Sequence, residues 1–403
     1  LEEIVVSSRS VVNYTALTMS SYYMLNKEPL GLNVPGRMFK ILTLFAITAL
    51  LGFLFFNQKS VASNFDSSDK STSPVYSVVC STSQTAVEEQ RIPAPVLLDS
   101  SDPTFAFTFA VRRNIDKLLS GKITGSNIKP FGSIYEQFKV AHALKLASCE
   151  NPKGMSTVLM NMMCYLYDEE KFLGENNNIA STWWSNSACN FRNALPSHRD
   201  VEKNMPFGVN HIAVIRNPFS RFVSAYLNKC VVEVNQGIHG GCYNCSTAEE
   251  PNCIIENVYE RLTTENIDKK MNRKTPYYYE TYHFAPQTWV CQMKEIYKST
   301  AFIRYADFGS GKREMYSNIV STLRAFNVPT RNVDYIEKSF ESQHKTWHAT
   351  RSMDERDKLI DNILSNRTLY DMLMDIYKHD FDIFEFSPPS FKDRTTRSAV
   401  KKV

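Results

Sequence analysis

The sequence predicts an α/β fold built on a mostly parallel sheet that is flanked by helices. Three short apolar runs have the character of buried strands, at 143–148, 211–215 and 301–305. Segments with apolar residues at helical spacing occur at 157–167, 221–232 and 358–378. Strands that alternate with helices in this way are typical of a parallel sheet covered on both faces. Ligands bind such sheets beyond the carboxyl ends of the strands, so the loops after 148 and 215 are where a site is expected.

Composition divides the 403 residues into an N-terminal leader (1–40), an apolar segment (41–56), a stem rich in Ser, Thr, Asp and Pro (57–102), a globular domain (103–390) and a basic tail (391–403). The apolar segment has no charge and no proline and would span roughly 24 Å as a helix, which predicts a single transmembrane anchor. So short a helix suits the thin membranes of the early secretory pathway, and we expect a Golgi protein.

The orientation of the anchor follows from the charges beside it. Arg37 and Lys40 precede the apolar segment and favour a cytoplasmic N-terminus, which predicts a type II protein with a lumenal domain. The alternative is a cleaved signal peptide, if translation begins at Met38. Two glycosylation sequons begin at Asn244 and Asn366, and their use would require a lumenal location.

Nine cysteines in a chain with a secretory signal predict several disulfides and at least one free thiol. Cys242, Cys245 and Cys253 could be imagined as zinc ligands, but no fourth ligand follows at the usual spacing, so disulfides are favoured. The acidic residues form no evident cluster, and we expect no metal. The net charge of +4 is small for this length and does not point to nucleic acid as a partner.

The loop after the first predicted strand has the geometry of a phosphate cradle. Backbone amides of Gly154, Met155, Ser156 and Thr157 would lie at a helix N-terminus and could donate to an anion, beside the positive charge of Lys153. The Walker A spacing of glycines is absent, which disfavours a nucleotide kinase. The alternative is an ordinary helix start with Ser156 or Thr157 as N-cap and Lys153 in solvent.

A second basic motif follows the strand at 211–215. Arg216 at the strand end could present its guanidinium to a phosphate, and Ser224 could add a hydroxyl from the same side of the next helix. We interpret Arg221 as a surface or salt-bridged residue. Together the two loops provide two separate phosphate sites, as a nucleotide phosphorylated at both its 3′ and 5′ positions would need.

The residues 152–157 resemble the 5′-phosphosulfate loop of sulfotransferases, and 216–226 resemble their 3′-phosphate motif. The resemblance continues through 283–291, 302–308 and 377–381. It is to the Golgi carbohydrate sulfotransferases that include the chondroitin 4-O and HNK-1 enzymes, in the form that is expanded in nematodes. It implies a P-loop-like sulfotransferase fold and transfer from 3′-phosphoadenosine-5′-phosphosulfate (PAPS) to a glycan acceptor, with chondroitin at the GalNAc 4-hydroxyl as the commonest case.

The resemblance also implies roles for individual residues. Lys153, Ser156 and Thr157 would hold the 5′-phosphosulfate, and Arg216 and Ser224 the 3′-phosphate. Glu150 departs from what such a loop favours, because its carboxylate repels phosphate unless it points away or pairs with Lys153 or Arg216.

Sulfuryl transfer further needs a base for the acceptor proton and a positive charge near the departing oxygen. Lys153 suits the second role. His283 is the preferred base, and Glu280, three residues earlier, is the alternative. Two other functions are compatible with the sequence: a sulfotransferase acting on protein tyrosine, and a membrane-anchored protein of the same fold that binds nucleotide or glycan without catalysis.

Overall fold

The computed structural model describes residues 96–392 except 97, 124, 133, 135–136, 238–241, 246–250, 265–276, 307–308 and 342–354. The predicted leader and anchor, most of the stem and most of the basic tail lie outside this part of the chain. Within it, no helix is both long enough and apolar enough to cross a membrane.

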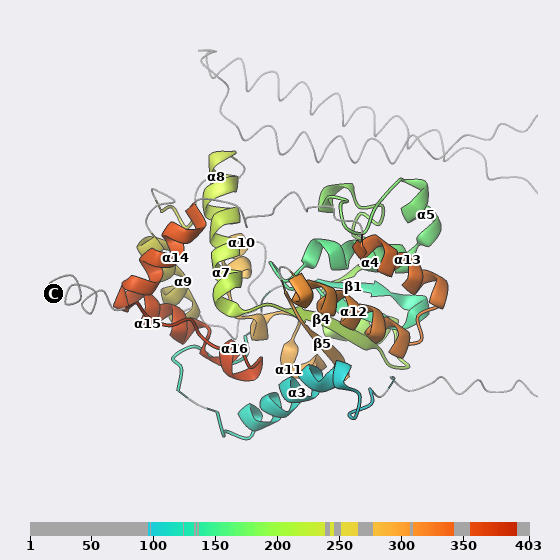
Figure 1. Ribbon diagram of the computed structural model, residues 1–403, viewed down its shortest axis with the longest axis horizontal. Coiled ribbons are helices and arrows are strands. Elements are labelled where there is room, and N and C mark those ends of the chain that lie inside the picture. Colours follow the sequence, from blue (N-terminus) through green and yellow to red (C-terminus); the bar gives the residue numbers. More distant parts are fainter. Residues whose placement is uncertain are drawn as a thin grey trace, which may run out of the picture. The chain divides into compact units, whose positions relative to one another are not determined.

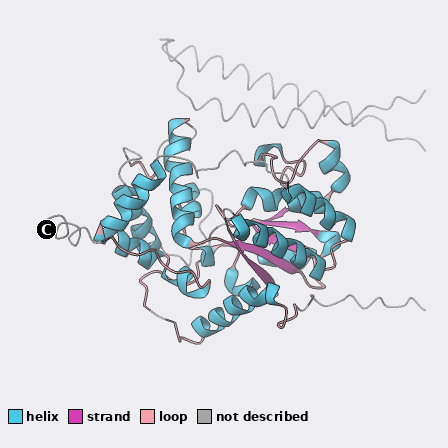
Figure 2. Ribbon diagram, viewed as in Figure 1, coloured by secondary structure: helices cyan, strands magenta, loops and turns pink. Residues whose placement is uncertain are grey.

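Five strands form one sheet in the described part of the chain. Figure 2 shows strands of this sheet with helices packed around them. Their order across the sheet is β3 (Ala194–Leu195), β1 (Phe138–Ala141), β2 (Leu146–Cys149), β4 (Asn210–Ile215) and β5 (Thr300–Arg304). The pairs β2·β4 and β4·β5 are parallel, as predicted, but β1 pairs antiparallel with both β2 and β3. The sheet is therefore mixed, and the expectation of a mostly parallel sheet holds only for β2, β4 and β5.

One face of the sheet packs against α4 (Ser156–Tyr167), α12 (Gly309–Ala325) and α13 (Thr330–Glu341) (Figure 1). On this face Ile212 and Val214 of β4 lie in one apolar cluster with side chains of the three helices. The alternate residues Ala213 and Ile215 point to the other face. Because both faces of β4 are covered, its sequence is a continuous apolar run rather than an alternating one.

The opposite face packs against α3 (Ala106–Leu119), α6 (His198–Asn204), α11 (Met293–Ile296) and the 3-10 turn η6 (Tyr297–Ser299). The helix α3 lies along β5. The Thr108 hydroxyl donates to the carbonyl oxygen of Phe302 over 3.1 Å and accepts from the amide of Phe302 over 3.0 Å. The 3-10 turn η1 (Pro103–Phe105) leads into α3, whereas η2 (His142–Leu144), η3 (Trp184–Asn186) and α5 (Glu169–Gly174) contact α4 on the first face.

A third apolar cluster is formed by helices beyond the end of the sheet (Figure 1). They are α7 (Pro218–Tyr226), its π-helical continuation η4 (Leu227–Val232), α9 (Pro251–Thr264), α10 (Tyr278–Phe284), η5 (Gln287–Trp289), α14 (Glu355–Ser365), α15 (Arg367–Ile376) and α16 (Lys378–Ile383), while the short α8 (Glu233–Asn235) continues from η4. We call this group of helices the helical lobe. It lies at the carboxyl end of β4, so it faces the loops in which the sequence placed the site.

The predicted single helix at 358–378 is interrupted at Asn366. The Asn366 side chain accepts a hydrogen bond from the Leu369 amide over 3.3 Å and caps a new helix, so α14 and α15 are separate. The prediction of one continuous helix was wrong because the apolar residues keep a helical spacing on both sides of the Asn366 cap, so their pattern does not reveal the break. The helix predicted at 221–232 begins earlier, at Pro218, and changes to π geometry at Leu227.

The eight cysteines in the described part of the chain form four disulfides: Cys149–Cys291, Cys164–Cys189, Cys230–Cys242 and Cys245–Cys253. The expectation of several disulfides is confirmed, and the zinc interpretation of 242–253 is wrong because these thiols are paired. The ninth cysteine, Cys80, lies outside the described residues.

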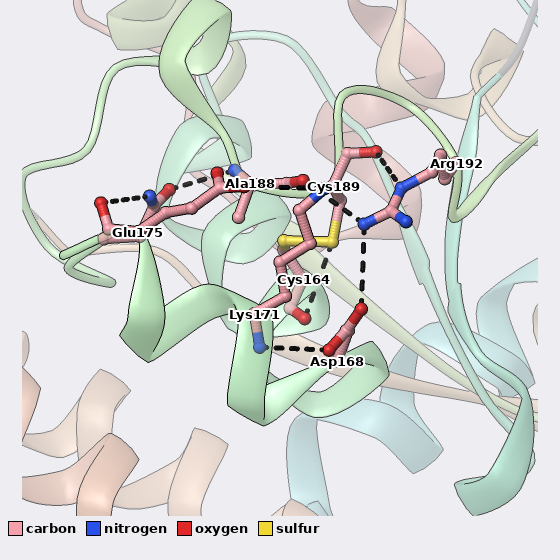
Figure 3. Close-up of a disulfide and its surroundings, with 8 residues drawn as sticks. Cys164, Asp168, Lys171, Glu175, Ala188, Cys189 and Arg192 are labelled. Carbon is pink, nitrogen blue, oxygen red and sulfur yellow. Dashed lines mark hydrogen bonds and ion pairs between the residues drawn. A yellow bond between two sulfur atoms is a disulfide. The ribbon is translucent and has the colours of Figure 1, made fainter. Parts of the chain in front are cut away.

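Figure 3 shows the Cys164–Cys189 disulfide, which links α4 to the loop after η3. Beside it the Arg192 guanidinium donates to the carbonyl groups of Cys189 over 3.3 Å and Ala188 over 3.4 Å, and it lies 3.6 Å from the Asp168 carboxylate. The disulfide and this arginine together hold the loop against α4.

Candidate active site

The loop between β2 and α4 has an unusual backbone. Lys153 (φ 63°) and Met155 (φ 68°) both lie in the left-handed region, which non-glycine residues seldom adopt. Met155 is the N-cap of α4, and no side chain caps the helix. Neither Ser156 nor Thr157 is therefore an N-cap, and the alternative of an ordinary capped helix start is wrong. The amides of the first turn keep their capacity to bind an anion.

Gly154 lies so close to the sheet that no side chain fits. A Cβ atom there would lie 2.8 Å from the backbone carbonyl oxygen of Val214 and 3.0 Å from Nδ2 of the Asn151 side chain. Asn151 itself is buried and donates to Val214 O over 3.1 Å and to Gln287 Oε1 over 2.8 Å. The loop is thus held against the end of β4 by direct backbone approach.

We expect Gly154→Ala to weaken binding of 3′-phosphoadenosine-5′-phosphate about tenfold, because the loop must move to relieve the contact with Val214 O. Titration calorimetry of the purified protein measures this. Gly174→Ala is the matched control, since a Cβ atom at Gly174 meets nothing within 4 Å. Equal affinities of the two variants would contradict the role given to Gly154.

Two arginines of the second motif hold successive carbonyl groups of this loop. Arg221 Nε donates to Pro152 O over 2.9 Å, and Arg216 Nη1 donates to Lys153 O over 3.2 Å. Arg216 also lies over the Tyr305 ring, with 4.7 Å between its guanidinium carbon and the ring centroid. The two motifs that the sequence analysis treated as separate loops therefore form one site.

The side chain of Lys153 reaches the π-helical segment η4. Its Nζ donates to Asn228 Oδ1 over 2.8 Å. Burial first, and then the positive charges of Lys229 and Arg216, lower the pKa of Lys153 well below its ordinary value. A site that already repels the charge on Lys153 binds an anion favourably, because the anion compensates several cations at once.

The residues Arg221, Ser224 and Asn228 follow one another at helical spacing along α7 and into η4, and the first and last of them contact the 152–153 segment. Ser224, between them, is 6% exposed. The structure thus places the predicted Ser224 on the side of α7 that faces the loop. Short π-helical segments such as η4 occur frequently at functional sites.

Gln287 joins the strand end to the helical lobe. Its Oε1 accepts from Arg216 N over 3.0 Å and its Nε2 donates to Arg216 O over 2.8 Å. The buried Asp380 carboxylate in turn accepts from the Gln287 amide over 2.8 Å and from the Thr288 amide over 3.1 Å. These contacts explain why the motifs at 283–287 and 377–381 accompany the phosphate motifs in one sequence.

His283 lies at the end of α10, close to the loop. Its Nδ1 is 2.7 Å from the carbonyl oxygen of Tyr279, so Nδ1 carries the proton and Nε2 keeps a lone pair. Burial first, and then the charge of Lys229, hold the pKa of His283 well below its ordinary value, and Lys153 and Arg221 act in the same direction. The imidazole is therefore a neutral base surrounded by cations.

The whole of this arrangement lies within a region that matches a known family. Residues 136–387 match the sulfotransferase family. The chain belongs to this family. The sulfotransferase is also 32% identical over 274 residues to a Caenorhabditis elegans protein named carbohydrate sulfotransferase chst-1, a match that covers 66% of this chain and 80% of the relative. A putative sulfotransferase of the same organism, vep-2, is 28% identical over 228 residues, which are 54% of this chain and 68% of the relative. No solved structure matches the chain.

Membership implies PAPS as the sulfuryl donor, and the residues present fit it. The uncapped start of α4, the closely approaching Gly154 and the cations Lys153, Arg216 and Arg221 together suit a ligand with several negative charges. In the described part of the sulfotransferase, no group of three or more His, Cys, Asp or Glu side chains could hold a metal ion.

Glu150 lies at the start of the loop between β2 and α4, which we call the donor loop, and its carboxylate has a partner that the sequence analysis did not consider. Its Oε2 lies 3.5 Å from Nζ of Lys139 in β1, a lysine whose side chain is 1% exposed. The Glu150 charge is thus compensated on the far side of the strand from the donor loop. The sequence analysis could not predict this partner, because it did not identify β1.

The alternative base, Glu280, acts on a different neighbour. Burial first, and the charge of Glu280 among the lesser causes, raise the pKa of Tyr243, a buried residue of the helical lobe. For His283, by contrast, the charge of Lys153 in the donor loop is among the causes of its lowered pKa.

Three residues that the sequence analysis did not select belong to the site: Asn228, Gln287 and Arg221. The interpretation of Arg221 as a surface or salt-bridged residue was wrong, because it is 0% exposed and its hydrogen bonds go to carbonyl groups. Asn228 could have been found from its helical spacing to Ser224. The role of Arg221 depends on carbonyl groups distant in sequence, and no local pattern reveals it.

Proposed function

We propose that this sulfotransferase moves the sulfuryl group of PAPS to a hydroxyl group of a glycan. The observation that carries the proposal is the convergence of Lys153, Arg216 and the start of α4 on one loop, with a neutral histidine beside it. The relative named carbohydrate sulfotransferase supports a carbohydrate as the acceptor class. Within that class we propose chondroitin, at the 4-hydroxyl of GalNAc.

In the proposed reaction the acceptor oxygen forms a bond to sulfur as the bond from sulfur to the bridging phosphate oxygen breaks. Nε2 of His283 takes the acceptor proton, and 3′-phosphoadenosine-5′-phosphate leaves. Lys153 and the amides from Gly154 to Thr157 stabilise the charge that develops on the bridging oxygen. Arg216 and Ser224 bind the 3′-phosphate and so hold the donor in line with the acceptor.

We further propose that the domain works in the Golgi lumen, anchored by the segment 41–56 as a type II membrane protein. Four disulfides in the described domain support an oxidising compartment. The sequon residue Asn244 is exposed, and Asn366 caps α15 through its oxygen, which leaves its nitrogen for a glycan. Unchanged gel mobility after enzymatic removal of N-linked glycans would count against a lumenal domain.

The function is tested by expressing the full chain in cultured animal cells and measuring transfer of radiolabelled sulfate from PAPS. The acceptors are a glycan panel that includes chondroitin and a tyrosine-containing peptide. We expect label on one glycan, and loss of that label in Lys153→Ala and Arg216→Ala. Label on the peptide alone would favour a tyrosine sulfotransferase. Bisphosphate binding without any transfer would favour a binding protein, and loss of both would overturn the proposed function.

A further inference from the structure

Among the described cationic side chains at the donor loop, that of Arg221 is the most buried. Its side chain is 0% exposed. Nε donates to Pro152 O over 2.9 Å, and Nη1 donates to Ala285 O over 2.8 Å. The remaining nitrogen, Nη2, is buried and has no hydrogen-bond partner in the described part of the chain.

The two carbonyl groups belong to opposite sides of the site. Pro152 directly precedes Lys153 in the donor loop, and Ala285 follows His283 by two residues at the end of α10. One rigid guanidinium therefore connects the loop that would hold the sulfuryl donor to the helix end that would hold the base. Planar guanidinium groups fix two acceptors at a defined separation, which a flexible lysine ammonium does not.

The charge of Arg221 has no ion-pair partner among the described residues. Asp380 is an acidic group whose field reaches it, but that carboxylate already accepts from the amides of Gln287 and Thr288. Burying a cation without an ion-pair partner costs free energy, and the charge of Asp380 offsets only part of that cost. Its presence beside the proposed site indicates a use that packing alone does not explain.

We propose that Arg221 is a positioning residue, which sets the separation of Lys153 and His283 by holding the carbonyl groups of Pro152 and Ala285. This inference rests on the proposed function, because it assumes the roles given to Lys153 and His283. Transfer requires the donor and the base in one fixed geometry, and a misplacement of about 1 Å can cost roughly 100-fold in rate.

A second effect of Arg221 acts through its charge. The groups around His283 are Lys153 from the donor loop, Lys229 from η4 with its partner Glu233, Arg221 from α7, and Tyr279, Glu280 and Tyr282 from α10 itself. Burial and Lys229 lower the pKa of His283 most, and Arg221 contributes in the same direction. Removal of the Arg221 charge should therefore let the pKa of His283 rise toward its ordinary value.

The experiment compares Arg221→Met with Arg221→Lys in the full chain. For Arg221→Met we expect kcat to fall about 100-fold and the acid limb of the kcat/KM profile to move to higher pH. Arg221→Lys keeps the charge but not the two fixed hydrogen bonds, so its kcat should fall while its acid limb stays in place. Arg192→Met is the matched control, since Arg192 also donates to two carbonyl groups, away from the site.

The inference is overturned if folded Arg221→Met loses thermal stability but keeps the kcat, KM and pH profile of the wild type. If Arg221→Met does not fold, an unchanged kcat in Arg221→Lys overturns it equally. Binding of 3′-phosphoadenosine-5′-phosphate separates this result from failure of the proposed function. A wild type that transfers sulfate to no acceptor contradicts the proposed function, while roughly tenfold weaker binding by Arg221→Lys would still support the link to Pro152.

Discussion

Replacing Lys153 with alanine is expected to lower kcat about 100- to 1,000-fold, the size of effect found when a group that stabilises developing charge is removed from an active site. The Lys153 ammonium lies at the donor loop and is held by Asn228 over 2.8 Å. No other described residue of this loop carries a positive side chain. Single-turnover measurement of sulfate transfer separates this loss from weaker binding of PAPS.

The pH dependence of the wild type gives a second test of Lys153. Burial and the neighbouring charges of Lys229 and Arg216 lower the pKa of Lys153 well below 10.5, and only its protonated form stabilises the leaving oxygen. The pH dependence of kcat/KM reports the pKa values of the free enzyme. We therefore expect kcat/KM for PAPS to fall with rising pH well before pH 10.5. The control is Lys171→Ala, at a lysine of α5 that pairs with Glu175. This change should leave kcat and its pH dependence unchanged. A comparable loss in that control would refute the assignment.

For His283→Gln we expect a fall in kcat of about 100- to 10,000-fold, the contribution typical of a general base. Glutamine keeps a hydrogen-bonding side chain but cannot accept the acceptor proton. Because the pKa of His283 is held well below 6.5, the wild type should remain active as the pH falls through 6.5 and lose activity only in more acidic solution. The acid limb should be absent from the profile of the variant.

The control for this change is His142→Gln, at a partly buried histidine that packs on Tyr167 away from the donor loop. It should retain the wild-type kcat and acid limb. If His283→Gln keeps full activity while Glu280→Gln loses it, the base is Glu280. Unchanged activity in both variants would mean that neither residue takes the proton.

The strands β2, β4 and β5 were predictable because each is an apolar run buried on both faces, and such runs stand out in a sequence. Their observed bounds differ from the predicted ones by at most three residues. The strand β1 was missed because it is four residues long and contains Lys139, a lysine whose burial depends on Glu150 and the Phe191 ring. A buried lysine in a strand is visible only when its partners are known.

The residues that we propose to bind the phosphates could be selected from sequence because each lies in a short segment with a recognisable motif. The contacts that bring these segments together join residues that are far apart in the sequence. Asp380 reaches the amide of Gln287 across 93 residues, and Asn151 reaches the side chain of Gln287 across 136. These partners are brought together where the helical lobe packs against the end of the sheet, an arrangement that sequence spacing alone does not determine.

The disulfide between Cys149 and Cys291 has a practical consequence for making the enzyme. It joins the residue before the donor loop to a residue four positions after Gln287, across a sequence separation of 142. Cross-links of this kind typically stabilise a protein by about 2–4 kcal/mol. Protein produced in a reducing bacterial cytosol, or purified in the presence of dithiothreitol, would lack it. An inactive sample prepared in that way would therefore report on its handling and not on its catalytic capacity.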